Sequence, residues 1–77
     1  MASSAESSLS KRYFEFVEGA SSKFWEVWTI VNELTTHWGR IGTAGQTKTK
    51  TFASPEMAQA EHDKLVLEKL AKGYQEK

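Results

Sequence analysis

Hydrophobic and polar residues alternate along much of the first two thirds of the chain, in short runs separated by turn-forming residues. These runs occupy residues 12–18, 23–31, 34–41 and 46–52, and each is joined to the next by a short connection. Alternation at every second residue is typical of β-strands, and short connections join antiparallel neighbours. The pattern therefore predicts four strands in an antiparallel meander.

The second and fourth predicted strands differ in the composition of their faces. Both faces of 23–31 are largely apolar, which is typical of a central strand that is covered on each side or offers part of one face to a partner. The strand 46–52 places Lys48 and Lys50 on one face and three threonines on the other. Lysines on an edge strand prevent unwanted pairing, so gatekeeping and phosphate contact both stay open as roles for these two lysines.

Residues typical of a helix start and a helix end bracket the segment after the last strand. Ser54 can cap the free backbone amides, and Pro55 suits the first helical position. We expect the helix to run to Ala71, with Gly73 in the left-handed conformation that ends many helices. Its buried side is expected to consist of Met57, Ala58, Ala60, Leu65, Val66, Leu67 and Leu70.

One helix lying across one face of this sheet defines the expected fold. It is an α+β domain, built from a four-stranded antiparallel meander with one C-terminal helix packed on one face. The other face of the sheet, or one of its ends, is left open. After the helix, Tyr74 is expected to fold back onto the sheet and residues 75–77 are expected to fray.

A chain of 77 residues suits one small domain. Residues 1–10 are small and polar, which predicts a disordered tail ahead of an ordered domain over 11–75. The absence of cysteine excludes disulfides and thiolate zinc sites and fits a reducing compartment. No apolar run approaches the roughly 20 residues that span a bilayer, so we expect a soluble, cytoplasmic protein without a membrane partner. We also expect a monomer.

Positive charge is concentrated in the middle of a chain whose net charge is zero. Ten basic residues balance ten acidic ones, which argues against a nucleic-acid binder held by bulk charge. From Leu34 to Pro55, however, the sequence contains Arg40, Lys48 and Lys50 and no acidic residue. Any electropositive patch should therefore centre on this segment.

Residues that could support catalysis or metal binding are few. The two histidines, His37 and His62, form no helical pair at metal-ligand spacing, and the chain has no cysteine to complete a site. Adjacent helical residues such as His62 and Asp63 do not face each other, and we expect His62 to lie at the edge of the core without a functional role. Gly42 and Gly45 lack the Gly-Lys-Ser/Thr ending of a phosphate-binding loop. We therefore expect no enzymatic activity, no catalytic residues, no metal and no cofactor.

The stretch Trp38-Gly39-Arg40 ends the third predicted strand and is followed at once by a glycine-marked turn. Side chains two residues apart in a strand point to the same face, so Trp38 and Arg40 can form one surface. An aromatic plane beside a guanidinium is suited to stacking on a nucleotide and contacting its phosphate. A tryptophan near a strand end can equally be part of the core.

This stretch is one of several landmarks that occur in a particular order along the chain. They are Lys23-Phe24-Trp25-Glu26-Val27, Trp38-Gly39-Arg40-Ile41-Gly42-Thr43, Gly45-Gln46, Phe52, Ala58, Lys69 and Lys72-Gly73-Tyr74. Their order and spacing resemble the WGR domain, named for its Trp-Gly-Arg signature, across roughly residues 11–75. Such domains occur in DNA-dependent poly(ADP-ribose) polymerases and in bacterial proteins, including molybdate-metabolism regulators, and this chain resembles the short bacterial sort.

The resemblance implies a binding module that recognises DNA ends or nicks. By motif, Trp38 would stack on the terminal nucleotide, Arg40 would contact the DNA end or a partner, and Gly39 would keep the backbone close to the ligand or the packed sheet. Lys48 and Lys50 are added to this candidate surface from the charge distribution alone. The alternative is a protein-interaction module in which Trp38 and Arg40 form a hot spot for another protein.

Overall fold

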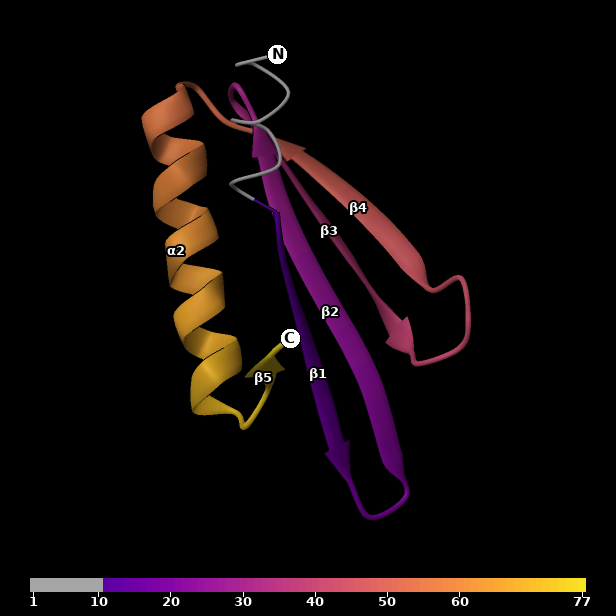
Figure 1. Ribbon diagram of the computed structural model, residues 1–77. Helices are drawn as coiled ribbons and strands as arrows, with labels where there is room; N and C mark the ends of the chain where they lie inside the picture. The colour runs from indigo at the N-terminus through magenta and orange to yellow at the C-terminus, as the bar shows by residue number, and fades with distance from the viewer. Residues whose placement is uncertain (1–10) are drawn as a thin grey trace.

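The computed structural model of the protein describes residues 11–77, which form one sheet and a helix (Figure 1). The elements are β1 (Arg12–Glu18), β2 (Ser21–Ile30), β3 (Glu33–Arg40), β4 (Gln46–Thr51), α2 (Pro55–Ala71) and β5 (Gln75–Glu76). The strand order is β4-β3-β2-β1-β5, and every neighbouring pair is antiparallel. The predicted α+β class and its four-stranded meander are confirmed, and β4 lies at an edge as expected. The predicted tail, residues 1–10, lies outside the described residues.

The short strand β5 corrects the expectation that residues 75–77 fray. Glu76 lies opposite Phe14 on β1, and the Lys77 amide donates to the Tyr13 carbonyl at 3.0 Å. The Arg12 guanidinium also donates to both carboxylate oxygens of Glu76, at 2.6 and 2.9 Å. The chain end is ordered because β1 would otherwise leave its outer backbone groups unpaired, and Glu76 places a carboxylate beside Arg12.

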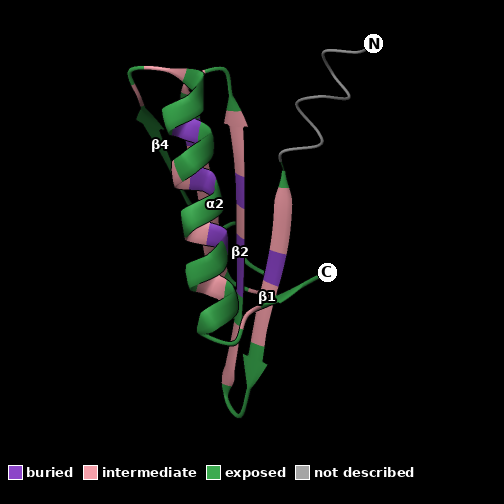
Figure 2. Cartoon of the chain, turned by 90° about the vertical axis from the view of Figure 1, so that its left-hand side faces the viewer, coloured by how far each residue is buried: buried purple, intermediate pink, exposed green. Residues whose placement is uncertain are grey.

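The core lies between α2 and one face of the sheet (Figures 1 and 2). Its buried residues are Phe14, Trp25, Val27, Leu34 and Val66. Phe14 and Trp25 lie opposite each other in neighbouring strands, with ring centroids 5.7 Å apart. Such tilted aromatic pairs stabilise a fold beyond the apolar area they bury.

The buried side of α2 is narrower than its sequence predicts. Ala58 and Val66 are buried as expected, together with His62, and these three positions form a stripe four residues apart that faces the sheet (Figure 2). Leu67 and Met57 are exposed to 67% and 52%. The other expected positions that the structure leaves exposed are Ala60 and Leu70. The helix packs on β2 and β3, so a residue one position away from the buried stripe turns about 100° toward solvent.

Both ends of α2 follow the sequence-based expectation. The Ser54 hydroxyl accepts a hydrogen bond from the Met57 amide, and Pro55 opens the helix. Gly73 ends it in a left-handed conformation with φ +102°. Tyr74 then folds back toward the sheet, with its ring centroid 5.3 Å from that of Phe16.

The connection between β2 and β3 lies one residue earlier than predicted. Val31 and Asn32 form the turn, in place of Asn32 and Glu33, and Val31 has φ +56°. A β-branched residue rarely adopts positive φ. The turn is held because the Asn32 side chain donates to the Phe52 carbonyl at 2.7 Å and the Asn32 carbonyl accepts the Phe52 amide at 2.8 Å.

None of the helical segments within residues 11–77 has the length and apolar character needed to cross a bilayer.

Candidate functional site

The strand register determines which side chains share a face of the sheet. Trp38 lies opposite Trp25, which belongs to the core beneath α2, and Arg40 lies opposite Lys23. Because side chains alternate along a strand, Trp38 and Arg40 both point to the face that α2 covers, which we call the helix face. The expectation that they share a face is therefore confirmed. Gly39, between them, belongs to the opposite face, which we call the outer face.

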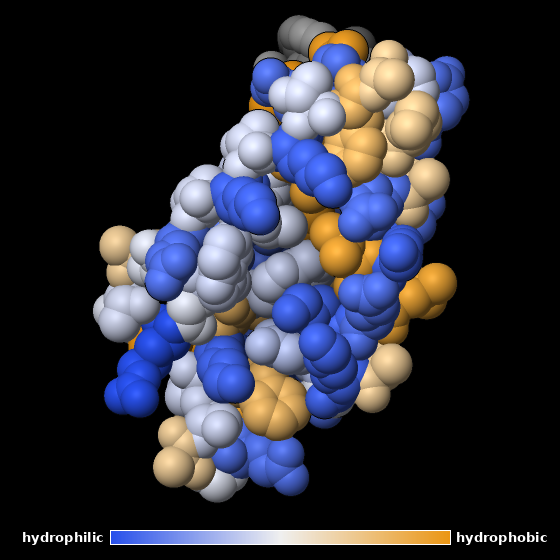
Figure 3. Space-filling view, turned by 180° about the vertical axis from the view of Figure 1, so that it is seen from behind, coloured by the Kyte–Doolittle hydropathy of each residue, from blue (hydrophilic) through white to orange (hydrophobic). Residues whose placement is uncertain are grey.

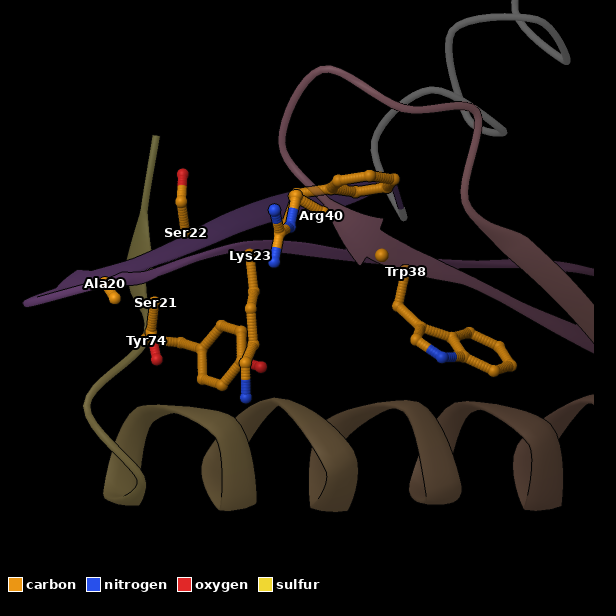
Figure 4. A pocket seen from close by; sticks show the side chains of 9 residues that line it. Ala20, Ser21, Ser22, Lys23, Trp38, Arg40 and Tyr74 are labelled. Atoms are coloured by element: carbon orange, nitrogen blue, oxygen red, sulfur yellow. The ribbon is translucent and has the colours of Figure 1, made fainter.

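Trp38 and Arg40 line one open cavity of about 410 Å³ at the end of the sheet, beside the returning chain (Figure 4). The lining residues are Ala20, Ser21, Ser22, Lys23, Phe24, Trp38, Gly39, Arg40 and Tyr74. Figure 4 shows the side chains of Trp38 and Lys23 extending from the sheet toward α2, with the side chain of Tyr74 lying between the sheet and α2. None of these nine residues carries a carboxylate, whereas Lys23 and Arg40 each carry a positive charge.

Trp38 is half-buried and packs against the core cluster while it also lines the cavity. Arg40 is exposed, and within residues 11–77 it makes no ion pair. The indole is therefore held in place by the core, whereas the guanidinium is free to reach a ligand.

Lys48 and Lys50 lie on the helix face but outside this cavity. They pair with Thr36 and Leu34 across β3, and all six residues of β4 are exposed. Together they border a smaller cavity of about 130 Å³ between β4 and α2, which is also lined by Leu34, Thr36, Glu61 and Leu65. Seen from the β4 side, hydrophilic residues flank a strip of paler and hydrophobic surface (Figure 3). The structure thus places the two lysines on the same face as Trp38, along its β4 edge.

Sequence reasoning missed Lys23 and Tyr74 as lining residues. Lys23 enters the cavity because it pairs with Arg40 across two strands, a register that the pattern along one strand does not reveal. Tyr74 enters because the chain reverses at Gly73. Beside it, the Lys69 ammonium lies 5.0 Å from the Tyr74 ring centroid, and burial lowers the pKa of Lys69.

Gly39 is where the loop after β3 packs onto the outer face. A Cβ at Gly39 would lie 2.8 Å from the Gly45 Cα, closer than real contacts allow. Gly45 itself has φ +73°, and a Cβ there would meet the Phe24 ring at 2.7 Å. The glycine of the signature thus allows loop 41–45 to lie directly against the sheet, and Figure 4 shows this loop on the side away from α2.

His37 holds the same loop from the outer face. Its Nδ1 lies 2.7 Å from a carboxylate oxygen of Glu26, and its Nε2 contacts the Ala44 carbonyl. The hydrogen bond to Glu26, followed by that to the Ala44 carbonyl, raises the pKa of His37 above 6.5. The ring also meets that of Phe24 edge-on, with centroids 4.9 Å apart.

His62 is buried at the core, and its contact with Asp63 corrects an expectation. The His62 Nδ1 lies 3.1 Å from the Asp63 carboxylate, and this contact lowers the pKa of Asp63. Adjacent helical side chains meet here because both lean toward the preceding turn, where the Gln59 amide nitrogen lies 2.9 Å from the Asp63 carboxylate and 3.4 Å from the His62 ring. Within residues 11–77, no cluster of three or more potential metal ligands is present.

Comparison with known proteins identifies related sequences and a related structure. The WGR domain profile matches residues 10–77. Protein YehF of Escherichia coli K12 is 40% identical over 65 residues, covering 84% of this chain and 24% of YehF. The uncharacterised protein YfeS of the same strain is 35% identical over 66 residues, covering 86% of this chain and 27% of YfeS. The chain thus spans about a quarter of the length of these relatives.

A crystal structure of a Bacteroides fragilis protein has the same fold as this chain. The two superpose with a TM-score of 0.85 and share 39% sequence identity, over 87% of this chain and 19% of the other. The described fold, including the strand β3 that carries both Trp38 and Arg40, therefore also occurs as part of a longer protein.

Proposed function

The chain belongs to the WGR domain family, and we propose that it is a non-catalytic module that binds DNA at ends or nicks through its helix face. One observation carries this proposal. The half-buried indole of Trp38 and the guanidinium of Arg40, which makes no ion pair within residues 11–77, line the same open cavity as Lys23, and none of the nine lining residues carries a carboxylate.

The cavity suits an exposed terminal nucleotide. Stacking of a base on an aromatic side chain contributes about 1–3 kcal/mol and tolerates any sequence, because every base has a π-face. Trp38 is already held by the core, so little side-chain freedom is lost when a base stacks on it. Arg40 can contact a phosphate with two parallel hydrogen bonds, and Lys23 adds a second cation across the strand pair.

Lys48 and Lys50 extend the proposed surface along β4. Phosphate contacts position a protein on DNA without reading its sequence, and two exposed lysines on the helix face can make such contacts beside the break. Protection of the β4 edge from unwanted pairing would account for the same lysines, and both roles are compatible.

Binding to dumbbell DNA, whose two ends are closed by hairpin loops, tests this proposal. We expect the protein to bind a dumbbell with one nick several-fold more tightly than the sealed dumbbell, as measured by fluorescence anisotropy. Arg40→Gln should remove most of that difference, because it deletes an exposed charge that makes no ion pair with any residue of the described range 11–77. Lys64→Gln, which removes an exposed charge from α2, is the matched control and should leave the affinity unchanged.

Equal affinity for nicked and sealed DNA would contradict recognition of breaks. Absence of binding to either DNA would overturn the proposal and favour the alternative, a surface on which Trp38 and Arg40 recognise another protein.

A further inference from the structure

Both ring nitrogens of His37 contact atoms that can only accept hydrogen bonds. Nδ1 lies 2.7 Å from a carboxylate oxygen of Glu26, and Nε2 contacts the carbonyl oxygen of Ala44. A neutral imidazole carries one N–H, so it can donate to one of these oxygens and must turn a lone pair toward the other. Both contacts are hydrogen bonds only when the ring is protonated.

We infer that protonated His37 is a clamp that holds loop 41–45 on the outer face and thereby positions the Trp38–Arg40 end of β3. When the proton is lost, the remaining N–H stays on Nδ1, because the ionised carboxylate of Glu26 is a stronger acceptor than a carbonyl. Nε2 then turns a lone pair toward the Ala44 carbonyl oxygen, and the loop loses this attachment. The clamp itself does not depend on the proposed DNA binding.

The loop is attached to the backbone that forms the cavity wall. The amide and the hydroxyl of Thr43 both donate to the Arg40 carbonyl, at 3.1 and 2.7 Å, and the Ile41 amide donates to the Ser22 carbonyl at 3.0 Å. Ser22 and Arg40 both line the cavity. A change in the loop on the outer face therefore reaches the segment whose other side presents Arg40.

The charges around His37 favour its protonated form. Glu26, on β2, is 14% exposed and supplies the nearest negative charge. The positive charge of Lys11 lowers the pKa of His37 in part, because its ammonium lies 3.9 Å from the other oxygen of the Glu26 carboxylate. Thr47, opposite His37 on β4, is uncharged.

On the β1 side, Tyr13 lies opposite Glu26 and donates its hydroxyl to the carboxylate of Glu15, at 2.8 Å. That carboxylate is therefore already engaged, and Glu26 is the one that meets the imidazolium. The hydrogen bonds to Glu26 and Ala44 outweigh the opposing effects of burial and Lys11, so the pKa of His37 is raised above 6.5. Both hydrogen bonds of the clamp are therefore formed at acidic pH, and one is lost as the pH rises through the raised value.

A pH titration of the free protein, followed by nitrogen-15 NMR, tests the clamp. We expect the ring nitrogens of His37 and the amides of Thr43, Ala44 and Gly45 to shift together, with one midpoint above pH 6.5. In His37→Gln the loop amides should show no such transition. In Glu26→Gln the midpoint of His37 should fall, because the neutral amide no longer favours the imidazolium.

Thr35→Val is the matched control, because it removes another side-chain hydrogen bond of β3, the one between the Thr35 and Thr49 hydroxyls. It should leave the midpoint of His37 where it is in the parent. A midpoint at or below 6.5, or loop amides that do not follow the ring nitrogens, would overturn the inference.

The consequence for the cavity rests on the proposed function. DNA affinity should decline through the His37 midpoint more steeply in the parent than in His37→Gln. Because the clamp is measured on the free protein, failure of DNA binding and failure of the clamp give separate results.

Discussion

The indole of Trp38 packs against the core beneath α2 and also lines the cavity at the end of β3. This position explains why the sequence left its role open between a structural and a binding residue. The alternation rule correctly places Trp38 and Arg40 on one face, but how deeply a side chain is buried depends on the helix above it. Residue 38 therefore serves stability and the proposed binding together.

Replacing Trp38 separates these two contributions. We expect Trp38→Ala to lower the free energy of unfolding by about 2 kcal/mol, since the side chain is half-buried and a fully buried tryptophan costs about 3–5 kcal/mol. It should also weaken binding to nicked DNA by about 1–3 kcal/mol. Urea denaturation and fluorescence anisotropy measure the two effects.

Trp28→Ala is the matched control, because Trp28 is also half-buried but lies on the outer face, beneath the Lys11 ammonium. It should cost stability and leave DNA affinity unchanged. Equal losses of affinity in the two variants would mean that Trp38 acts through folding alone.

The glycines of the loop differ in what surrounds them. Gly45→Ala should destabilise the protein by about 2 kcal/mol or more, because its φ of +73° disfavours alanine and a Cβ would meet the Phe24 ring. Gly42 also has positive φ, +96°, but its Cβ would meet nothing within 4 Å, so Gly42→Ala should cost about 1 kcal/mol. Thermal denaturation compares them, and equal losses would argue against close packing of the loop on Gly39.

At the scale of elements, the spacing of hydrophobic residues and the turn-forming residues predict the four long strands and the helix. Short or mixed patterns give wrong expectations. The strand β5 has two residues, too few to show alternation, and it pairs with β1, whose Arg12 lies more than 60 residues from its partner Glu76. On α2, apolar residues are spread over several positions, and the buried stripe includes His62, a polar residue. Which of the competing stripes is buried depends on how the helix packs on β2 and β3, and the helix sequence alone does not reveal this.

The attachment of β5 predicts a dependence of stability on pH. The hydrogen bond from Arg12 lowers the pKa of Glu76 below 4.5, so this carboxylate stabilises the folded state above pH 4.5, and the stabilisation is lost as the pH falls through the lowered value. Because both side chains are more than a third exposed, the pair contributes no more than about 1 kcal/mol.

Urea denaturation of the parent and Glu76→Gln at pH 7 and near pH 2.5 tests this attachment. The parent should be the more stable at pH 7, and the two should converge at low pH. A difference that persists in acid would show that the ion pair is not its source.

At the scale of the molecule, a net charge of zero conceals an uneven distribution. Lys23, Arg40, Lys48 and Lys50 all belong to the helix face. Three of these four cations, Arg40, Lys48 and Lys50, lie in the segment 34–55, which the sequence singled out because it contains no acidic residue. Lys23 could not be found in that way, because its place beside Arg40 depends on pairing between β2 and β3. A surface shared by several strands is visible in a sequence only once the register is known.

Titration of the nitrogen-15-labelled protein with a nicked dumbbell DNA tests the central claim most directly, because it locates the binding surface. We predict that shifts concentrate on the Trp38 indole and on the amides of Lys23, Gly39, Arg40 and β4, and that high salt reverses them. Shifts confined to the outer face, or a Trp38 indole signal that does not move at saturating DNA, would contradict the account.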